Sequence, residues 1–239
     1  MNVYQLSDIS ESVRGNAYPG RGIVLGRTAD GTRAVAAYFI MGRSANSRNR
    51  VFAVRDGAVF TEPFDASKVE DPSLIIYAAL RSLENRLIVT NGDQTDTVYE
   101  GLKAGKTFSE SLESRRFEPD APNFTPRISG LFTLDPDRPR YEMSILKSID
   151  ENGSDCARFV FSYPAMPGLG HFLHTYVRDG SPLPTFTGEP ERVRIGNSID
   201  ECTDALWENL DADNKISLYV RFTDLKKGSY EERLINRNR

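Results

Sequence analysis

One short stretch of the chain gathers side chains of the kind that bind phosphate. An apolar run over 37–41 breaks at Gly42, and the loop that follows holds Arg43, Arg48 and Arg50. Guanidinium groups clamp phosphate oxygens in pairs, and small hydroxyl and amide side chains complete such a cradle. The loop contains no acid, and its small polar side chains are Ser44, Asn46, Ser47 and Asn49. It predicts a site for a phosphorylated ligand, against the alternative of a solvated basic turn.

A second polar group, Asn91-Gly92-Asp93, follows the short apolar run 87–90 and precedes a predicted helix. Glycine allows backbone angles that other residues avoid, and a helix N-terminus attracts anions. These residues are therefore candidates for lining a pocket. An ordinary turn between a strand and a helix explains them equally well.

A third group lies in the proline-rich stretch 117–126, which holds Glu118 and Asp120 just before Arg127. Prolines lower the entropy lost when a loop is fixed in one shape. A stiff loop that carries a carboxylate beside an arginine can hold an acid or base in place. The alternative is a surface loop whose charges only aid solubility.

Other patterns predict no cofactor chemistry. His171 and His174 lie three apart on a predicted strand and so face opposite sides, which argues against a shared metal ion. The glycine-rich run over 164–170 lacks the Gly-Lys-Ser/Thr ending of a phosphate-binding loop and is expected to be a flexible loop or lid. Cys156 and Cys202 form no metal or redox motif. No hydrolase triad pattern is present.

The bulk properties limit the partners. The 239 residues carry a net charge of −4 and a pI of about 5.4. Duplex nucleic-acid binders usually present a broad basic surface, so we expect no nucleic-acid partner. The polar N-terminal sequence resembles no signal peptide, and no apolar run is long enough to span a bilayer. We therefore expect a cytoplasmic protein with no membrane partner.

The pattern of elements predicts an α+β protein of antiparallel sheets covered by helices. Asp30-Gly31 and Asp56-Gly57 indicate tight turns between strands. Strands are predicted at 22–27, 33–41, 51–55, 87–90, 127–134, 140–149, 156–163, 172–178 and 216–222. Helices are predicted at 72–86, 95–102, 107–116 and 199–210, the first from an Asp71-Pro72 start and the last two from capping boxes at Thr107 and Ser198.

No repeat, low-complexity tract or linker divides the sequence, so we predict one domain over 1–239. Residues 1–17 form an N-terminal extension that packs on the main fold or hangs from it. Residues 226–239 form a charged tail that is expected to fray.

Together these motifs resemble the archaeal-type IMP cyclohydrolase family. The resemblance begins with Tyr18-Pro19-Gly20-Arg21-Gly22 and continues through Gly42-Arg43-Ser44 and Asn49-Arg50. It then runs in order through Tyr77, Thr90-Asn91-Gly92-Asp93, Glu118-Pro119-Asp120 and Thr125-Pro126-Arg127-Ile128. It covers roughly residues 18–135, and the N-terminal extension departs from the family pattern.

The resemblance implies a four-layered α-β-β-α sandwich similar to N-terminal-nucleophile hydrolases, without the exposed N-terminal nucleophile that those enzymes use. It also implies the closure of 5-formamidoimidazole-4-carboxamide ribonucleotide to IMP with loss of water. No cofactor or metal is implied, because the formyl group is already on the substrate. A homo-oligomer is expected.

The resemblance also distributes roles among the candidate residues. Glu118 is expected to transfer protons, Tyr77 to orient the substrate or stabilise the oxyanion, and Arg50 to act beside them. The expected substrate-binding residues are Arg43, Ser44, Arg48, Asn49, Asn91, Gly92, Asp93 and Arg127.

Two alternatives remain open from the sequence. In the first, a protein with the same fold binds a purine nucleotide or a related phosphoribosyl compound without turnover. A single-stranded RNA binder could use the arginine loop with Tyr38 and Phe39 as stacking platforms, although at least one of these must face the core.

Overall fold

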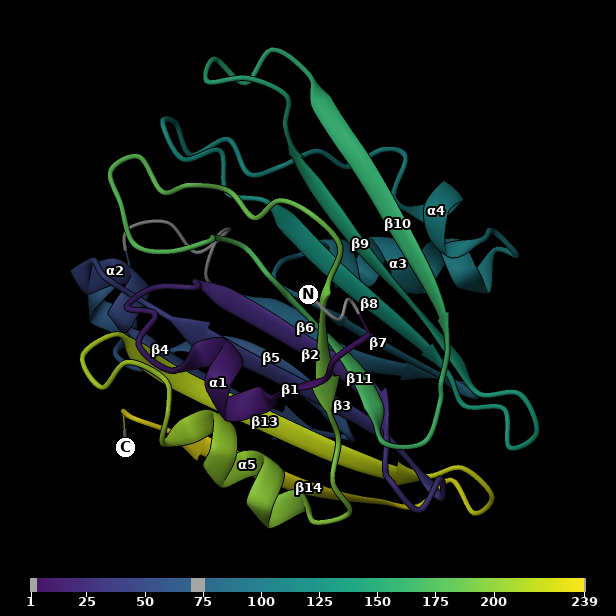
Figure 1. Ribbon diagram of the computed structural model, residues 1–239. Helices are drawn as coiled ribbons and strands as arrows, with labels where there is room; N and C mark the ends of the chain where they lie inside the picture. Colours follow the sequence, from purple (N-terminus) through teal and green to yellow (C-terminus); the bar gives the residue numbers. More distant parts are fainter. Residues whose placement is uncertain (1–3, 70–75, 239) are drawn as a thin grey trace.

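A computed structural model describes residues 4–69 and 76–238, and their strands form two sheets (Figure 1). The order in the first sheet is β1 (Ser7–Asp8), β12 (Glu191–Arg194), β11 (Leu169–His174), β2 (Arg21–Arg27), β3 (Arg33–Met41), β13 (Lys215–Asp224) and β14 (Tyr230–Asn236). The order in the second is β10 (Cys156–Pro164), β9 (Arg140–Ser148), β8 (Arg127–Thr133), β7 (Arg86–Thr90), β6 (Tyr77–Leu83), β5 (Ala58–Pro63) and β4 (Arg50–Arg55). Every neighbouring pair is antiparallel except β1 with β12.

The two sheets pack face to face around a shared apolar core. Ile23 of the first sheet and Met143 of the second belong to one buried cluster. Helices cover the outer faces (Figure 1): α1 (Ile9–Val13) and α5 (Ile199–Trp207) pack on the first sheet, α3 (Gln94–Lys103) and α4 (Phe108–Ser111) on the second. This arrangement confirms the α+β class and is consistent with a sandwich of largely antiparallel sheets.

Local signals in the sequence position several elements correctly. Asp56 (φ 50°) and Gly57 (φ 74°) make the predicted tight turn between β4 and β5. The Thr107 capping box starts α4, although this helix ends at Ser111 rather than near residue 116. Ser198 caps α5 by accepting a hydrogen bond from the Glu201 N–H. Among the described residues, no helix is long and apolar enough to cross a membrane.

The predicted helix over 72–86 is wrong where the structure describes it. Tyr77 begins β6, which pairs with β5 and β7. Asp71 and Pro72, from which the helix was predicted, lie outside the described residues. The Ala-Ala-Leu run favours a helix locally, but pairing with strands on both sides outweighs that preference.

The C-terminal tail is more ordered than predicted, and the structure decides between the two alternatives for the N-terminal extension. The tail expected to fray contains β14, which pairs along β13. The N-terminal extension packs rather than hangs, because Ile9 and Val13 of α1 are buried against α5. The predicted strand 172–178 lies instead at Leu169–His174, and β5 and β12 were not predicted.

Candidate functional site

The candidate site lies at one end of the sandwich, where strands of both sheets begin or end. The first sheet contributes Arg21 at the start of β2. The second contributes Arg50, Tyr77 and Arg127 at the starts of β4, β6 and β8, and the turn after β7. Glu118 comes from the loop that precedes β8, and its backbone N–H donates to the Thr125 carbonyl at 2.9 Å.

Two arginines bring positive charge into this end of the interior. Arg50 is 2% exposed and donates to the carbonyls of Ser47 (2.7 Å) and Met41 (2.9 Å). Burial and the neighbouring Arg21 cation lower the pKa of Arg50. The Arg21 Nε is buried with no hydrogen-bond partner in the described part of the chain. Like charges so close together, with an unused donor, favour a bound anion.

Glu118 supplies a carboxyl group beside these cations and is only 5% exposed. Burial raises its pKa above the usual glutamate value, and Asp120 adds to this effect. Arg21 and Arg127 oppose the rise without cancelling it. A carboxyl group with a raised pKa can take up and release a proton nearer neutral pH.

Tyr77 lies at the same end and is 6% exposed. Its hydroxyl lies 2.9 Å from the hydroxyl of Tyr38, a residue of β3 in the opposite sheet. The Tyr77 phenol group is one of the neighbours that act to raise the pKa of Arg21 and of Arg50. A tyrosine hydroxyl held in this way can orient a substrate or donate to a developing negative charge.

The turn after β7 brings Asn91, Gly92 and Asp93 against Arg127. Arg127 Nη1 lies 2.7 Å from Asp93 Oδ1 and donates to Gln94 Oε1 at 2.6 Å. A Cβ on Gly92 would lie 2.5 Å from Arg127 Nη1 and 2.6 Å from Gln94 Oε1, so a larger residue would displace the Arg127 guanidinium. Burial opposes the Asp93 carboxylate, but Arg127 and Arg115 lower its pKa overall.

Asn91 serves the backbone of this turn. It accepts from the Ile128 N–H at 2.9 Å and donates to the Pro126 carbonyl at 2.9 Å. These bonds tie the β7 turn to the start of β8, which fixes the position of Arg127.

The rest of the arginine loop makes contacts within the protein. Ser44 caps the short helix α2 (Ala45–Arg48), and Asn49 bonds with the backbone of Asp65. Arg43 is exposed and pairs with Asp179 at 2.6 Å. Arg48 donates to the Gly42 carbonyl and to Asn214. The structure therefore brings Arg50 together with Tyr77, Glu118 and Arg127. The other predicted binding residues of the loop contact different parts of the protein; they are Arg43, Ser44, Arg48 and Asn49.

Comparison with known proteins supplies the family. A family model described as IMP cyclohydrolase-like protein matches residues 18–228. The chain belongs to this family. A protein of Methanopyrus kandleri named IMP cyclohydrolase is 37% identical over 116 residues, which cover 47% of this chain and 57% of that protein. One of Methanococcus maripaludis with the same name is 34% identical over 123 residues, covering 49% of this chain and 59% of its own length. The chain thus spans somewhat more than half the length of the curated relatives it matches.

The sequence reading of this family member missed several residues of the site. Arg21 stands in the Tyr-Pro-Gly-Arg-Gly run that carries the resemblance, but no sequence pattern predicts a role for it. Gln94 and Thr125 are both buried; Gln94 accepts from Arg127, and the Thr125 carbonyl accepts from the Glu118 N–H. The signal available for Arg21 was a charged residue opening a strand whose interior is apolar.

The RNA-binding alternative loses its stacking platforms. Tyr38 is 1% exposed and Phe39 is fully buried, so neither ring is available to a base. The two histidines of β11 have separate partners: His171 Nδ1 lies 2.7 Å from the Tyr141 hydroxyl, and His174 Nδ1 lies 2.7 Å from the Tyr176 carbonyl. The described residues contain no group of three or more His, Cys, Asp or Glu arranged to hold a metal ion.

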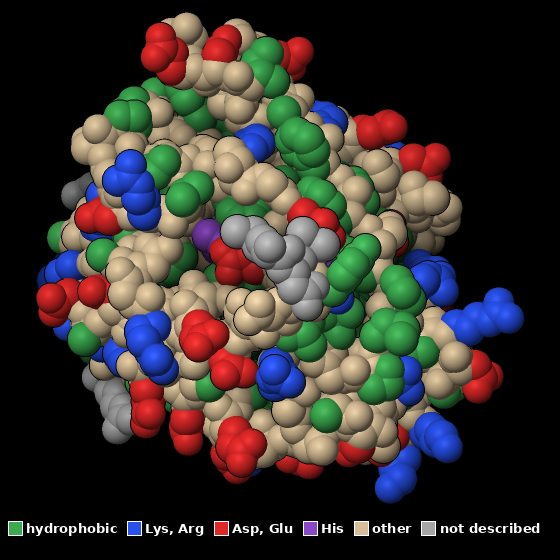
Figure 2. All heavy atoms as spheres, viewed as in Figure 1, with side chains coloured by type: hydrophobic (Ala, Val, Ile, Leu, Met, Phe, Trp, Pro, Cys, Tyr) green, Lys and Arg blue, Asp and Glu red, His purple; other side chains and the backbone are tan. Residues whose placement is uncertain are grey.

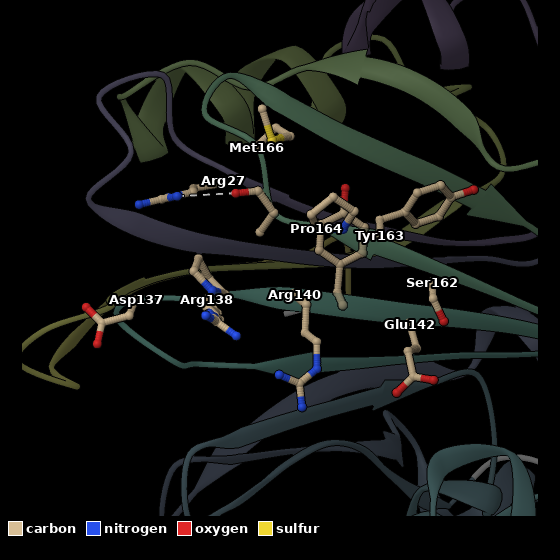
Figure 3. A pocket seen from close by; sticks show the side chains of 12 residues that line it. Arg27, Asp137, Arg138, Arg140, Glu142, Ser162, Tyr163, Pro164 and Met166 are labelled. Carbon is tan, nitrogen blue, oxygen red and sulfur yellow. Dashed lines mark hydrogen bonds between the residues drawn. The ribbon is translucent and has the colours of Figure 1, made fainter.

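A hollow of about 660 Å³ lies at the other end of β2, against β9 and β10 (Figure 3). Arg27 there donates to the Ala165 carbonyl at 3.3 Å. The glycine-rich run expected to be a flexible loop or lid is a short connection at this end, and the Gly168 N–H donates to the Arg27 carbonyl of β2. Charges of both signs line the hollow, and the candidate site residues lie at the opposite end of the strand.

Proposed function

We propose that this protein closes 5-formamidoimidazole-4-carboxamide ribonucleotide to IMP with release of water, as an IMP cyclohydrolase. The observation that carries the proposal is the buried Glu118 carboxyl group beside Arg21 and Arg127, within the segment that matches the family. Curated relatives named IMP cyclohydrolase support it, although they match only about half of the chain.

The reaction needs three kinds of help. The carboxamide nitrogen attacks the formyl carbon, a new C–N bond forms, and a tetrahedral adduct results. The attacking nitrogen loses one proton and the formamide nitrogen loses another, and the former formyl oxygen gains both and leaves as water. A carboxamide is a weak nucleophile, so the two arms must be held together. The adduct needs a donor for its oxygen and a group that moves protons.

The site residues divide these tasks. Glu118 moves the proton between nitrogen and the departing oxygen, because its pKa is raised by burial. Tyr77, paired with Tyr38, orients the substrate or donates to the adduct oxygen. Arg50 and Arg21 attract the anionic parts of the ligand.

The remaining predicted contacts complete the pocket. Arg127, held by Asp93 and the turn at Gly92, lines the wall beside Glu118, and Asn91 fixes that turn. Arg43 and Arg48, with Ser44 and Asn49, keep the predicted role of binding the phosphate. To bind the phosphate, Arg43 must leave Asp179. Their ion pair is exposed, so opening it costs less than about 1 kcal/mol.

The direct test mixes purified protein with the formamido ribonucleotide and monitors the formation of IMP by its ultraviolet absorbance. The expected result is turnover that persists in the presence of a metal chelator. IMP binding measured by calorimetry without any turnover would favour a nucleotide-binding protein instead. If the protein neither binds IMP nor forms it, both functions are refuted.

We also infer that the fold is the four-layered sandwich of the N-terminal-nucleophile type and that the protein works as a homo-oligomer. Helices on the outer face of each sheet support the first inference. The proposed chemistry involves no covalent intermediate, so it calls for no N-terminal nucleophile.

A further inference from the structure

The edge strand β10 exposes an apolar surface that the proposed reaction does not use. β10 runs from Cys156 to Pro164, and β9 is its only strand neighbour among residues 4–69 and 76–238. Phe159 is 44% and Val160 is 40% exposed. In Figure 2 hydrophobic side chains gather on the part of the surface where Figure 1 draws β10. Long apolar edge strands are open to pairing with another strand.

The other edges of the two sheets are protected in ways that β10 is not. β1 has only two residues. β14 carries Glu231, Glu232 and Arg233 in succession. On β4, the Asn236 side chain occupies both the N–H and the carbonyl of Phe52 at 2.9 Å each. β10 from Phe159 to Pro164 carries no charge and shows no register shift against β9.

The sequence of β10 is complementary to itself in the antiparallel direction. If two copies pair with Val160 opposite Val160, Phe159 lies opposite Phe161 of the second copy, and Arg158 lies opposite Ser162. Cross-strand aromatic pairs stabilise sheets, and no charged residue then faces a like charge. We propose that β10 pairs with β10 of a second copy of this chain, which joins the second sheets of the two molecules into one continuous sheet.

The side chains on both faces of β10, each lying in a row with its cross-strand neighbours, fit this pairing. Within each molecule, Phe159 lies beside Ile145 of β9, and Phe161 beside Met143. The inner row therefore becomes apolar across four strands and covers the exposed Phe159 ring. On the outer row Ser162 lies beside Glu142, and Figure 3 shows these two side chains on the same side of the sheet. Arg158 of the second copy then falls in the same row as an acid.

The test compares two exposed edge residues. Val160→Lys places two lysines directly opposite each other in the paired form, whereas Leu234→Lys changes a residue of similar exposure (39%) on β14. The molar mass of each protein is measured by analytical ultracentrifugation over a dilution series. We expect a self-associating wild type, a rise of roughly a hundredfold in the dissociation constant for Val160→Lys, and no change for Leu234→Lys.

A cross-link tests the register without a charge. With Cys156 replaced by serine, Val160→Cys should form a disulfide between copies on mild oxidation, because directly opposite residues of an antiparallel pair have Cα atoms about 4.5–5.5 Å apart. Leu234→Cys in the same background should not. A monomeric wild type at about 100 μM, the same association for wild type and Val160→Lys, or no cross-link at position 160 would each overturn the proposal. Activity is not the readout, so failure of the proposed function would be seen separately.

Discussion

Replacing Glu118 with glutamine tests the proposed proton transfer most directly. The amide keeps the size of the side chain in a position that is only 5% exposed, but it cannot exchange a proton near neutral pH. General acid–base catalysis by one side chain contributes about 10² to 10⁴ in rate. We therefore expect kcat for ring closure to fall by roughly a hundredfold or more, which corresponds to about 2.7 kcal/mol of activation free energy.

The pH dependence gives the test its sharpest readout. Burial raises the pKa of Glu118, so the acid side of the kcat/KM profile should titrate above the usual glutamate value. That acid limb should disappear in Glu118→Gln. The exposed neighbour Glu113 provides a matched control, and Glu113→Gln should keep both the rate and the limb.

The same variant has a predicted effect on stability. The folded state holds the Glu118 proton more tightly than the unfolded state does, so this residue makes the free energy of unfolding fall as pH rises from the unfolded to the folded pKa. Glu118→Gln should remove that fall and be no less stable than wild type at pH 8, as measured by urea unfolding. A kcat within about threefold of wild type together with an unchanged acid limb would refute the assignment of proton transfer to Glu118.

Three further changes test the surroundings of the site and the core. Tyr77→Phe removes a hydroxyl held at 2.9 Å, and steady-state kinetics should show kcat about tenfold lower; an unchanged kcat contradicts the role. Gly92→Ala places a Cβ 2.5 Å from Arg127 Nη1 and should raise KM about tenfold, whereas Gly196→Ala, with its nearest atom 4.0 Å away, should not; equal KM values would refute this contact. Burial lowers the pKa of His171 to about 4, so the folded state keeps this ring neutral where the unfolded state protonates it. The free energy of unfolding should therefore fall by up to about 3 kcal/mol as pH drops from 6.5 towards 4. Urea unfolding at several pH values should show a flatter profile for His171→Gln, and parallel profiles would contradict this.

Predictions that depend on a few neighbouring residues survive in the structure. The turn at Asp56-Gly57 and the cap at Ser198 are set within four residues, so the sequence alone predicts them. The strand that begins at Tyr77 is different. Its pairing partners lie in β5 and β7, and no local pattern in Tyr-Ala-Ala-Leu reveals them. β14 was missed for a related reason, since its charges suit an exposed edge strand as well as a tail.

The candidate site was predictable in its residue types but only partly in its arrangement. Glu118, Arg127 and Arg50 were all selected from the sequence. Arg21 was not, because its importance comes from the meeting of two sheets. No spacing along the chain shows that the first residue of β2 interacts with a loop nearly a hundred residues later.

The crossing between the sheets also explains why residue 50 is an arginine. The chain leaves the first sheet after Met41 and enters the second at Arg50, so carbonyl groups at this junction need donors that a regular ladder does not supply. Arg50 donates to two of these carbonyls, Ser47 and Met41, from Nε and Nη2. A lysine has one nitrogen and no planar fork, so it cannot span both carbonyls in the same way. Because these bonds hold the guanidinium beside Arg21 and Tyr77, the same side chain closes the junction between the sheets and fixes a positive charge at the site.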